Sequence, residues 1–332
     1  MYRQIVRAIV QRSVNNLSGF VGRREVDDRL RRPMNIRVRT PIVALLIAIA
    51  PAAAPGPAPG RATEPRAASG VVLHLQMRAP VLGGEQRRVQ VYLPPSYSAP
   101  DSASRSYPVI VLLHGWPGSE GNWFGLGRGA ETADSMIANR TIPEVILVSP
   151  NGSGLGLLGR SLYLDSFDGS SRIADYVLRD VVEWTDARFR TRREPGTRGI
   201  IGLSDGASAA LILAFRHPDV FGACGGHSGQ YRLTREWTLR RVLGPEPLSA
   251  RLLDENSPTL VADTVAARLR GLSIYFDVGT SDGSLADNRA LHHKLDSLGV
   301  VHIYREFAGT HDWAYWRTHL RESLIAVTER MR

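Results

Sequence analysis

The sequence predicts a doubly wound α/β fold, in which one mostly parallel sheet carries helices on both faces and forms a single domain. Two observations carry this prediction. Short continuous apolar runs recur at 108–113, 145–148 and 200–203, as is typical of buried parallel strands. Between the second and third runs, residues 173–189 place apolar side chains at helical spacing. Strands that alternate with helices in this way favour a doubly wound sheet.

The other elements continue the alternation. In the second of two opening strands Val89, Val91 and Leu93 alternate with polar residues, as in a half-exposed strand. The two prolines that follow cannot donate to a strand ladder and end it. The further expected elements are strands at 71–77, 87–93, 221–226, 272–279 and 301–307, a helix after the strand at 200–203, and a last helix at 313–330.

The N-terminal segment has the features of a secretory signal. Met34 is followed by two arginines, an apolar run from Ile42 to Ala50 and small residues for cleavage, which predicts a signal peptide over 34–54. The protein is therefore expected to be secreted or periplasmic, with membrane contact only through this signal. The alternative is an uncleaved membrane anchor at 41–50.

The sequence predicts three further segments, one before that signal and two after it. Residues 1–33 are either a start assigned too early, with Met34 the true one, or a basic tail. Residues 55–69 are rich in proline and alanine and predict a linker. The globular domain is expected to cover 70–332, a length that can bury a substantial core.

Charge and cysteine content exclude several classes of function. Residues 1–70 hold 12 of the basic and 4 of the acidic residues, leaving 29 basic and 28 acidic residues beyond them. A nearly neutral domain makes nucleic acid an unexpected partner. Cys224 is the only cysteine, so no intramolecular disulfide can form. No metal site is expected, because His292 and His293 are adjacent on a helix and point in different directions.

Ser204 is the candidate nucleophile. It lies in a G-x-S-x-G pattern, Gly202 to Gly206, between a buried strand and a helix. In that context the serine occupies a sharp turn with its hydroxyl exposed, and larger side chains at the glycine positions would collide with the neighbouring strand and helix. A small-residue turn without chemistry is the alternative interpretation.

A base and an acid follow Ser204 in chain order. His311 lies in a loop past the strand at 301–307, and His227, which also follows a strand, is its rival. Asp282 lies in the loop after the strand at 272–279, whereas Asp277 is still inside that strand. The order serine, acid, histidine is that of α/β-hydrolase triads, so we predict Ser204, Asp282 and His311 as the catalytic residues.

Backbone amides are predicted to stabilise the oxyanion of the tetrahedral intermediate. One is the N–H of Asp205, the residue after the nucleophile. The other is expected in the loop after the strand at 108–113, where Pro117 has no N–H. Trp116 is therefore the better donor, with Gly115 next.

Several motifs resemble the esterase D family of α/β-hydrolases, and the resemblance covers nearly all of 70–332. It implies the α/β-hydrolase fold, the same triad, the same two oxyanion amides and no cofactor. Members include S-formylglutathione hydrolases, feruloyl esterases and mycolyltransferases. Asp205 departs from the family pattern, which has Met there, and its carboxylate is expected to disfavour anionic substrates. The motifs that carry the resemblance are 111–116, 162–166, 202–206, 279–282 and 309–316.

The long segment 151–171 follows a strand on the catalytic side and is expected to form a substrate wall rather than an ordinary surface loop. Its candidate residues, with two tryptophans from elsewhere, are Tyr163, Asp165, Trp123 and Trp313. The expected function is an exported serine carboxylesterase acting on a small-molecule or carbohydrate-linked ester. An acyltransferase with the same triad is the alternative, and a non-catalytic binding protein on the same fold is the second.

Overall fold

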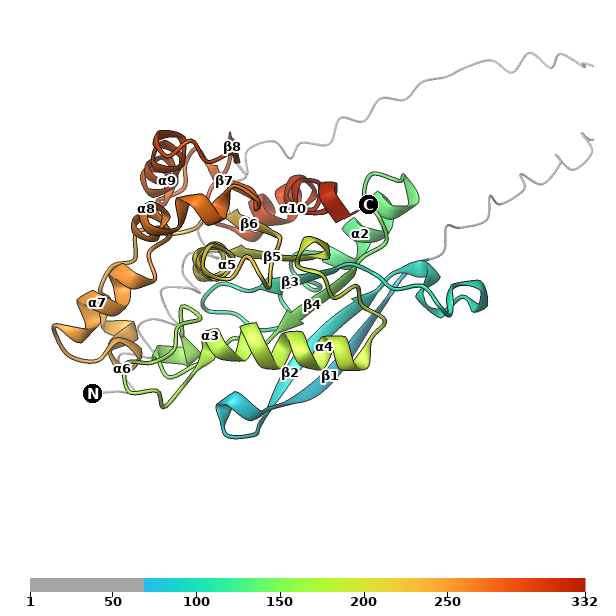
Figure 1. The fold of residues 1–332 in the computed structure, drawn as a ribbon, viewed down its shortest axis with the longest axis horizontal. Helices are drawn as coiled ribbons and strands as arrows, with labels where there is room; N and C mark the ends of the chain where they lie inside the picture. The colour runs from blue at the N-terminus through green and yellow to red at the C-terminus, as the bar shows by residue number, and fades with distance from the viewer. Residues whose placement is uncertain (1–68, 332) are drawn as a thin grey trace, which may run out of the picture. The chain divides into compact units, whose positions relative to one another are not determined.

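One sheet organises the chain in the computed structural model, which describes residues 69–331 (Figure 1). Its strand order is β1-β2-β4-β3-β5-β6-β7-β8. Strands β3 to β8 run parallel, while β2 is antiparallel to both of its neighbours. The strands are β1 (Val71–Ala79), β2 (Glu85–Leu93), β3 (Val109–Leu113), β4 (Ile146–Pro150), β5 (Arg198–Leu203), β6 (Ala223–His227), β7 (Ser273–Gly279) and β8 (Ile303–Phe307).

Helices cover both faces of this sheet, which confirms the predicted fold class. The helix predicted at 173–189 is continuous through Arg188, although its middle turn, Tyr176–Val181, is π-helical. The helices are α2 (Gly129–Ala138), α3 (Ile173–Asp175), α4 (Val182–Arg188), α5 (Asp205–Arg216), α6 (Arg240–Leu243), α7 (Leu248–Glu255), α8 (Pro258–Leu269), α9 (Leu285–Ser297) and α10 (Trp313–Thr328), with short 3-10 turns between them.

Two hydrophobic cores lie on opposite faces of the sheet. In β3, Val109, Val111 and Leu113 pack with α5, whereas Ile110 and Leu112 pack with α2 and α10. Successive side chains of a strand point to opposite faces, so a continuous apolar run is what a strand buried on both faces requires. A third, smaller leucine-rich cluster joins α6 and α7 to the segment 151–171.

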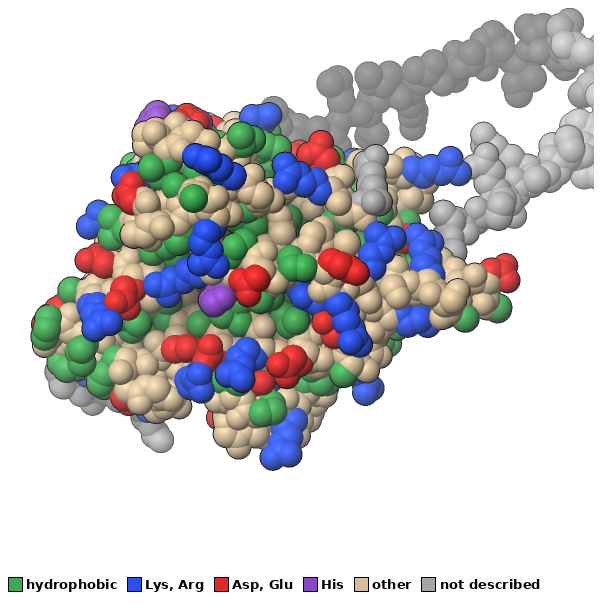
Figure 2. All heavy atoms as spheres, in the orientation of Figure 1, with side chains coloured by type: hydrophobic (Ala, Val, Ile, Leu, Met, Phe, Trp, Pro, Cys, Tyr) green, Lys and Arg blue, Asp and Glu red, His purple; other side chains and the backbone are tan. Residues whose placement is uncertain are grey.

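The N-terminal predictions lie outside the described residues. The expected signal peptide at 34–54 and the segment at 1–33 both fall there, as does most of the linker at 55–69. Within 69–331, no helix has the length and apolar character needed to cross a membrane. Figure 2 shows acidic and basic side chains interspersed over the visible face of these residues, in keeping with their near-neutral charge balance.

Candidate active site

The turn between β5 and α5 holds Ser204 in an unusual backbone conformation. Its φ is 54° and its ψ is −123°, a region that residues other than glycine rarely adopt. The flanking glycines permit this turn: a Cβ on Gly202 would lie 2.0 Å from the carbonyl oxygen of Gly206, and one on Gly206 would lie 2.5 Å from that of Leu113. The local backbone therefore requires the glycines of the motif and presents the serine hydroxyl at the strand end.

The structure brings Ser204, His311 and Asp282 together from three separate strand ends. Nε2 of His311 lies 2.9 Å from Oγ of Ser204, and its Nδ1 lies 2.9 and 3.1 Å from the two carboxylate oxygens of Asp282. The His311 side chain is 43% exposed and that of Asp282 is 1% exposed. The imidazole is therefore open to an incoming substrate on one side and held by a buried acid on the other.

Asp282 is held in its ionised form. Burial raises the pKa of its carboxyl, but hydrogen bonds from His311, the Ser284 amide and Ser228 outweigh that effect and bring the pKa down to about 2. The Ser284 amide and hydroxyl each donate to Oδ1 at 2.8 Å. An ionised acid next to Nδ1 keeps the proton on that nitrogen and leaves Nε2 free to accept one from the serine.

The two rival residues, His227 and Asp277, bind each other instead. Nδ1 of His227 lies 2.9 Å from Oδ2 of Asp277, and its Nε2 lies 2.9 Å from the hydroxyl of Ser323. The hydroxyls of Tyr275 and Tyr315 also donate to Asp277. Both rivals are 0% exposed, so no substrate can reach this serine–histidine–aspartate arrangement. The network fixes α10, which begins just after His311, to β6 and β7.

The segment proposed to supply an oxyanion amide lies beside the nucleophile. A Cβ on Gly115 would meet Cβ of Ser204 at 3.0 Å, so the backbone at 114–116 passes close to the serine. The indole of Trp116 donates to the carbonyl of Leu157 at 2.9 Å, which fixes this residue against the 151–171 segment. These contacts hold the Trp116 backbone next to the turn that carries Ser204.

Sequence analysis missed Arg160, which lies against the active site. Its guanidinium binds both carboxylate oxygens of Asp205 at 2.8 and 3.0 Å, and also pairs with Glu236. It lies over the ring of Trp116, with Cζ 4.9 Å from the ring centroid. The guanidinium offsets the charge of Asp205 only in part, because it is shared with Glu236, and this weakens the physical basis for the expected exclusion of anionic substrates. The pattern of the sequence held no sign of this pairing, because Arg160 lies 45 residues before its partner.

Arg160→Met is expected to destabilise the protein by about 3 kcal/mol, because it leaves the Asp205 carboxylate largely buried without its partner. The side chains of the pair are only 6% and 11% exposed, so water cannot replace the guanidinium fully. Urea unfolding measures the change. The double variant Arg160→Met with Asp205→Asn should recover much of the loss, and a single variant as stable as the parent would contradict this account.

The predicted substrate wall is only partly formed by the expected residues. Tyr163 lines a cavity beside Trp116 and Asp205, and its hydroxyl donates to the carbonyl of His114. Asp165 instead accepts the Ala174 amide and so holds the start of α3.

The two tryptophans differ in burial. Trp123 is a core residue at 0% exposure, with its indole bonded to the Leu113 carbonyl, so placing it in the wall was wrong. Trp313 is half-buried and packs edge-on against Trp123.

The cavity next to the nucleophile turn is small. It is lined by backbone and side chains of Gly115, Trp116, Arg160, Tyr163 and Asp205, and its volume is about 10 Å³. That is roughly the space one water molecule needs.

Comparison with known proteins identifies relatives over most of the chain. The family model described as "Putative esterase" matches residues 81–327. A protein of Corynebacterium glutamicum, described as uncharacterized, is 30% identical over 256 residues, covering 75% of this chain and 58% of that protein. An esterase of Mycobacterium tuberculosis is 27% identical over 251 residues, covering 67% of this chain and 52% of its own length. The chain thus spans about half the length of these curated relatives.

A solved structure supports the same assignment of the fold. A ferulic acid esterase superposes with a TM-score of 0.71 and 26% identity, covering 79% of this chain and 99% of that protein. Other solved esterases and S-formylglutathione hydrolases match at lower identity and show the fold alone. The matched region includes the strand ends that carry Ser204, Asp282 and His311.

Proposed function

Because the chain belongs to the "Putative esterase" family, we propose that it is a serine carboxylesterase whose triad is Ser204, His311 and Asp282. The observation that carries the proposal is the pair of contacts at His311, with the serine hydroxyl at 2.9 Å on one nitrogen and the acid on the other. A serine hydroxyl is a weak nucleophile until a base takes its proton, and this geometry supplies the base.

The first half of the reaction forms an acyl-enzyme. Oγ of Ser204 attacks the ester carbonyl carbon while its proton moves to Nε2 of His311, and the carbonyl oxygen becomes an oxyanion. The amides of Asp205 and Trp116 are the proposed donors to that oxyanion. The bond to the alcohol oxygen then breaks, and the proton on Nε2 leaves with the alcohol.

The second half regenerates the serine. Water gives a proton to Nε2 and attacks the acyl carbon, and the same oxyanion forms again. The bond between the acyl carbon and Oγ of Ser204 then breaks, Nε2 returns its proton to Oγ, and the acid leaves. Asp282 stays ionised throughout and stabilises the imidazolium each time it forms. Neither half draws on a cofactor.

The small cavity suits the oxyanion rather than an acyl chain. It lies between Trp116 and Asp205, whose amides are the proposed donors, and its volume of about 10 Å³ is roughly the space of one water molecule. The acyl and alcohol parts of the ester then lie on the open side of His311, whose side chain is 43% exposed. Acetyl and feruloyl esters of small molecules or carbohydrates are both candidate substrates.

A panel of p-nitrophenyl acyl esters, acetylated sugars and methyl ferulate tests this function. Release of acid and alcohol in water is the expected result. Turnover that requires an added alcohol acceptor and yields a new ester in place of the free acid would assign the protein as an acyltransferase instead. No turnover of any ester would overturn the proposal and favour a binding protein on this fold.

We also propose export, on the signal pattern at 34–54. In a secreting host the mature chain is expected to begin between about Ala52 and Ala62, after the small residues that suit signal cleavage. The intact mass of the purified protein shows at which residue the mature chain begins. A mature chain that still carries 34–50 would support the anchor alternative.

A further inference from the structure

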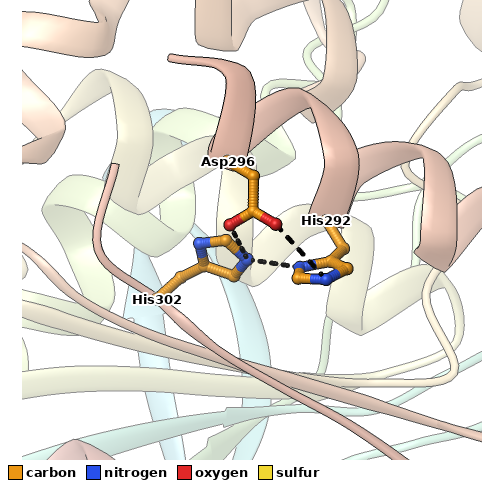
Figure 3. A group of neighbouring side chains, drawn as sticks. All are labelled: His292, Asp296 and His302. Carbon is orange, nitrogen blue, oxygen red and sulfur yellow. Dashed lines mark hydrogen bonds and ion pairs between the residues drawn. The ribbon is translucent and has the colours of Figure 1, made fainter. Parts of the chain in front are cut away.

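A second group of reactive side chains lies away from the triad. His292 and Asp296 come from consecutive turns of α9, and His302 comes from the loop between α9 and β8 (Figure 3). The triad residues follow the carboxyl ends of strands, whereas His302 directly precedes the amino end of β8. The cluster therefore lies at the opposite edge of the parallel sheet from Ser204.

The three side chains converge on one point, as Figure 3 shows. Nδ1 of His292 and Nε2 of His302 are 2.8 Å apart, and Oδ1 of Asp296 is 3.9 Å from that Nε2. One ligand atom from each residue lies within 4.8 Å of the other two. For tetrahedral coordination by nitrogen and oxygen, neighbouring ligand atoms are roughly 3.3 Å apart. The observed separations fall on either side of that value, so small side-chain rotations suffice.

His302 is already held in the orientation of a metal ligand. Its Nδ1 lies 2.8 Å from the carbonyl oxygen of Val300, which can only accept, so Nδ1 carries the proton. Nε2 then presents its lone pair to the cluster. The ring is stacked on Phe276, and the side chain is 3% exposed, so it cannot easily turn away. A backbone carbonyl on the second nitrogen is the usual partner of a metal-ligating histidine.

His292 and Asp296 give the cluster its access and its charge. Their side chains are 31% and 59% exposed, so an ion can enter from solvent. Without an ion, Nδ1 of His292 must donate a proton to the lone pair of His302. With an ion, that proton moves to Nε2 of His292, which lies 3.4 Å from Oδ2 of Asp296. Among residues 69–331, the ion pairs of Asp296 are with these two histidines alone.

We propose that His292, Asp296 and His302 bind one divalent transition-metal ion of the Zn²⁺ type, with water completing its coordination. Two imidazole nitrogens and one carboxylate oxygen suit Zn²⁺, Co²⁺ and Ni²⁺, whereas Ca²⁺ and Mg²⁺ require mainly oxygen ligands. The site brings together α9 and the start of β8, so the ion stabilises that junction. This goes against the expectation from the sequence that no metal site exists, which considered His292 beside His293, because only the fold brings His302 to His292.

Titration of the tag-free full chain with Co²⁺, followed by visible absorption and calorimetry, tests the site. We expect one ion per chain, displaced by Zn²⁺, with weaker binding as the pH falls because protons compete for the imidazoles. His292→Gln and Asp296→Asn should each weaken binding at least tenfold. His293→Gln is the matched control, since His293 is exposed on the same helix and, although its ring packs against that of His292 at 5.3 Å between centroids, it adds no ligand atom to the cluster; this variant should bind as the parent does.

Three outcomes would overturn the proposal. The first is no binding at millimolar Co²⁺, which would leave only a hydrogen bond between the two imidazoles. The second is a loss of Co²⁺ affinity in the His293→Gln control as large as that in the cluster variants. The third is unchanged binding in both cluster variants, which would place the ion elsewhere, for example at His311. Asp296 is largely exposed, so its variant keeps the test valid if the His292 variant fails to fold. Esterase activity should be unchanged in all three variants.

Discussion

Ser204→Ala is expected to abolish turnover of p-nitrophenyl acetate, lowering kcat by about 10⁶-fold. The variant removes the only group that can bond to the acyl carbon, while the turn, His311 and Asp282 remain in place. Steady-state hydrolysis measures the loss, and a fluorophosphonate probe should no longer label the protein. Circular dichroism should match the parent, because within residues 69–331 the hydrogen bond of this hydroxyl is the exposed one to Nε2 of His311.

Ser208→Ala is the matched control for that variant. Ser208 lies one turn further along α5, is 2% exposed, and donates to the carbonyl of Gln230 at 2.7 Å. The Ser208→Ala variant should keep kcat within a few-fold of the parental value, and the fluorophosphonate probe should still label it. Substantial hydrolysis by the Ser204 variant would refute the nucleophile assignment, whatever the control does.

Asp282→Asn is expected to lower kcat by about 10⁴-fold and to leave the protein folded. An amide can donate to the imidazole and so hold the ring with its proton on the nitrogen that faces Ser204. That tautomer cannot act as a base. The nucleophile and the oxyanion amides survive, so some rate above that of water should remain. Initial rates at saturating substrate measure the effect.

Asp277→Asn should do the reverse, lowering the stability of the protein while leaving kcat nearly unchanged. Asp277 accepts hydrogen bonds from His227, Tyr275 and Tyr315 in a site that is fully buried, and an amide cannot replace all of these acceptors. Hydrogen bonds to charged groups contribute about 1.5–3 kcal/mol each, so stability should fall clearly while kcat stays near the parental value. If this variant loses activity and the Asp282 variant does not, at equal stability, the acid is Asp277.

Local sequence pattern determined the elements that carry the chemistry. The unbroken apolar run in β3 reflects burial on both faces of a sheet, a requirement that acts residue by residue and is therefore visible in the sequence. The glycines around Ser204 are determined in the same way, since the turn leaves no room for a Cβ. The order of serine, acid and histidine follows from those strand ends.

Pairing between distant residues was decided only by the tertiary structure. Three such contacts are the pairing of Arg160 with Asp205, that of His227 with Asp277, and the bond from Trp123 to the Leu113 carbonyl. They join residues 45, 50 and 10 positions apart in the sequence. Such contacts depend on strand order and loop path, and no periodicity records them. The same holds for His302, which meets His292 because β8 starts beside α9. Sequence thus determined where reactive side chains emerge, and the fold decided which of them meet.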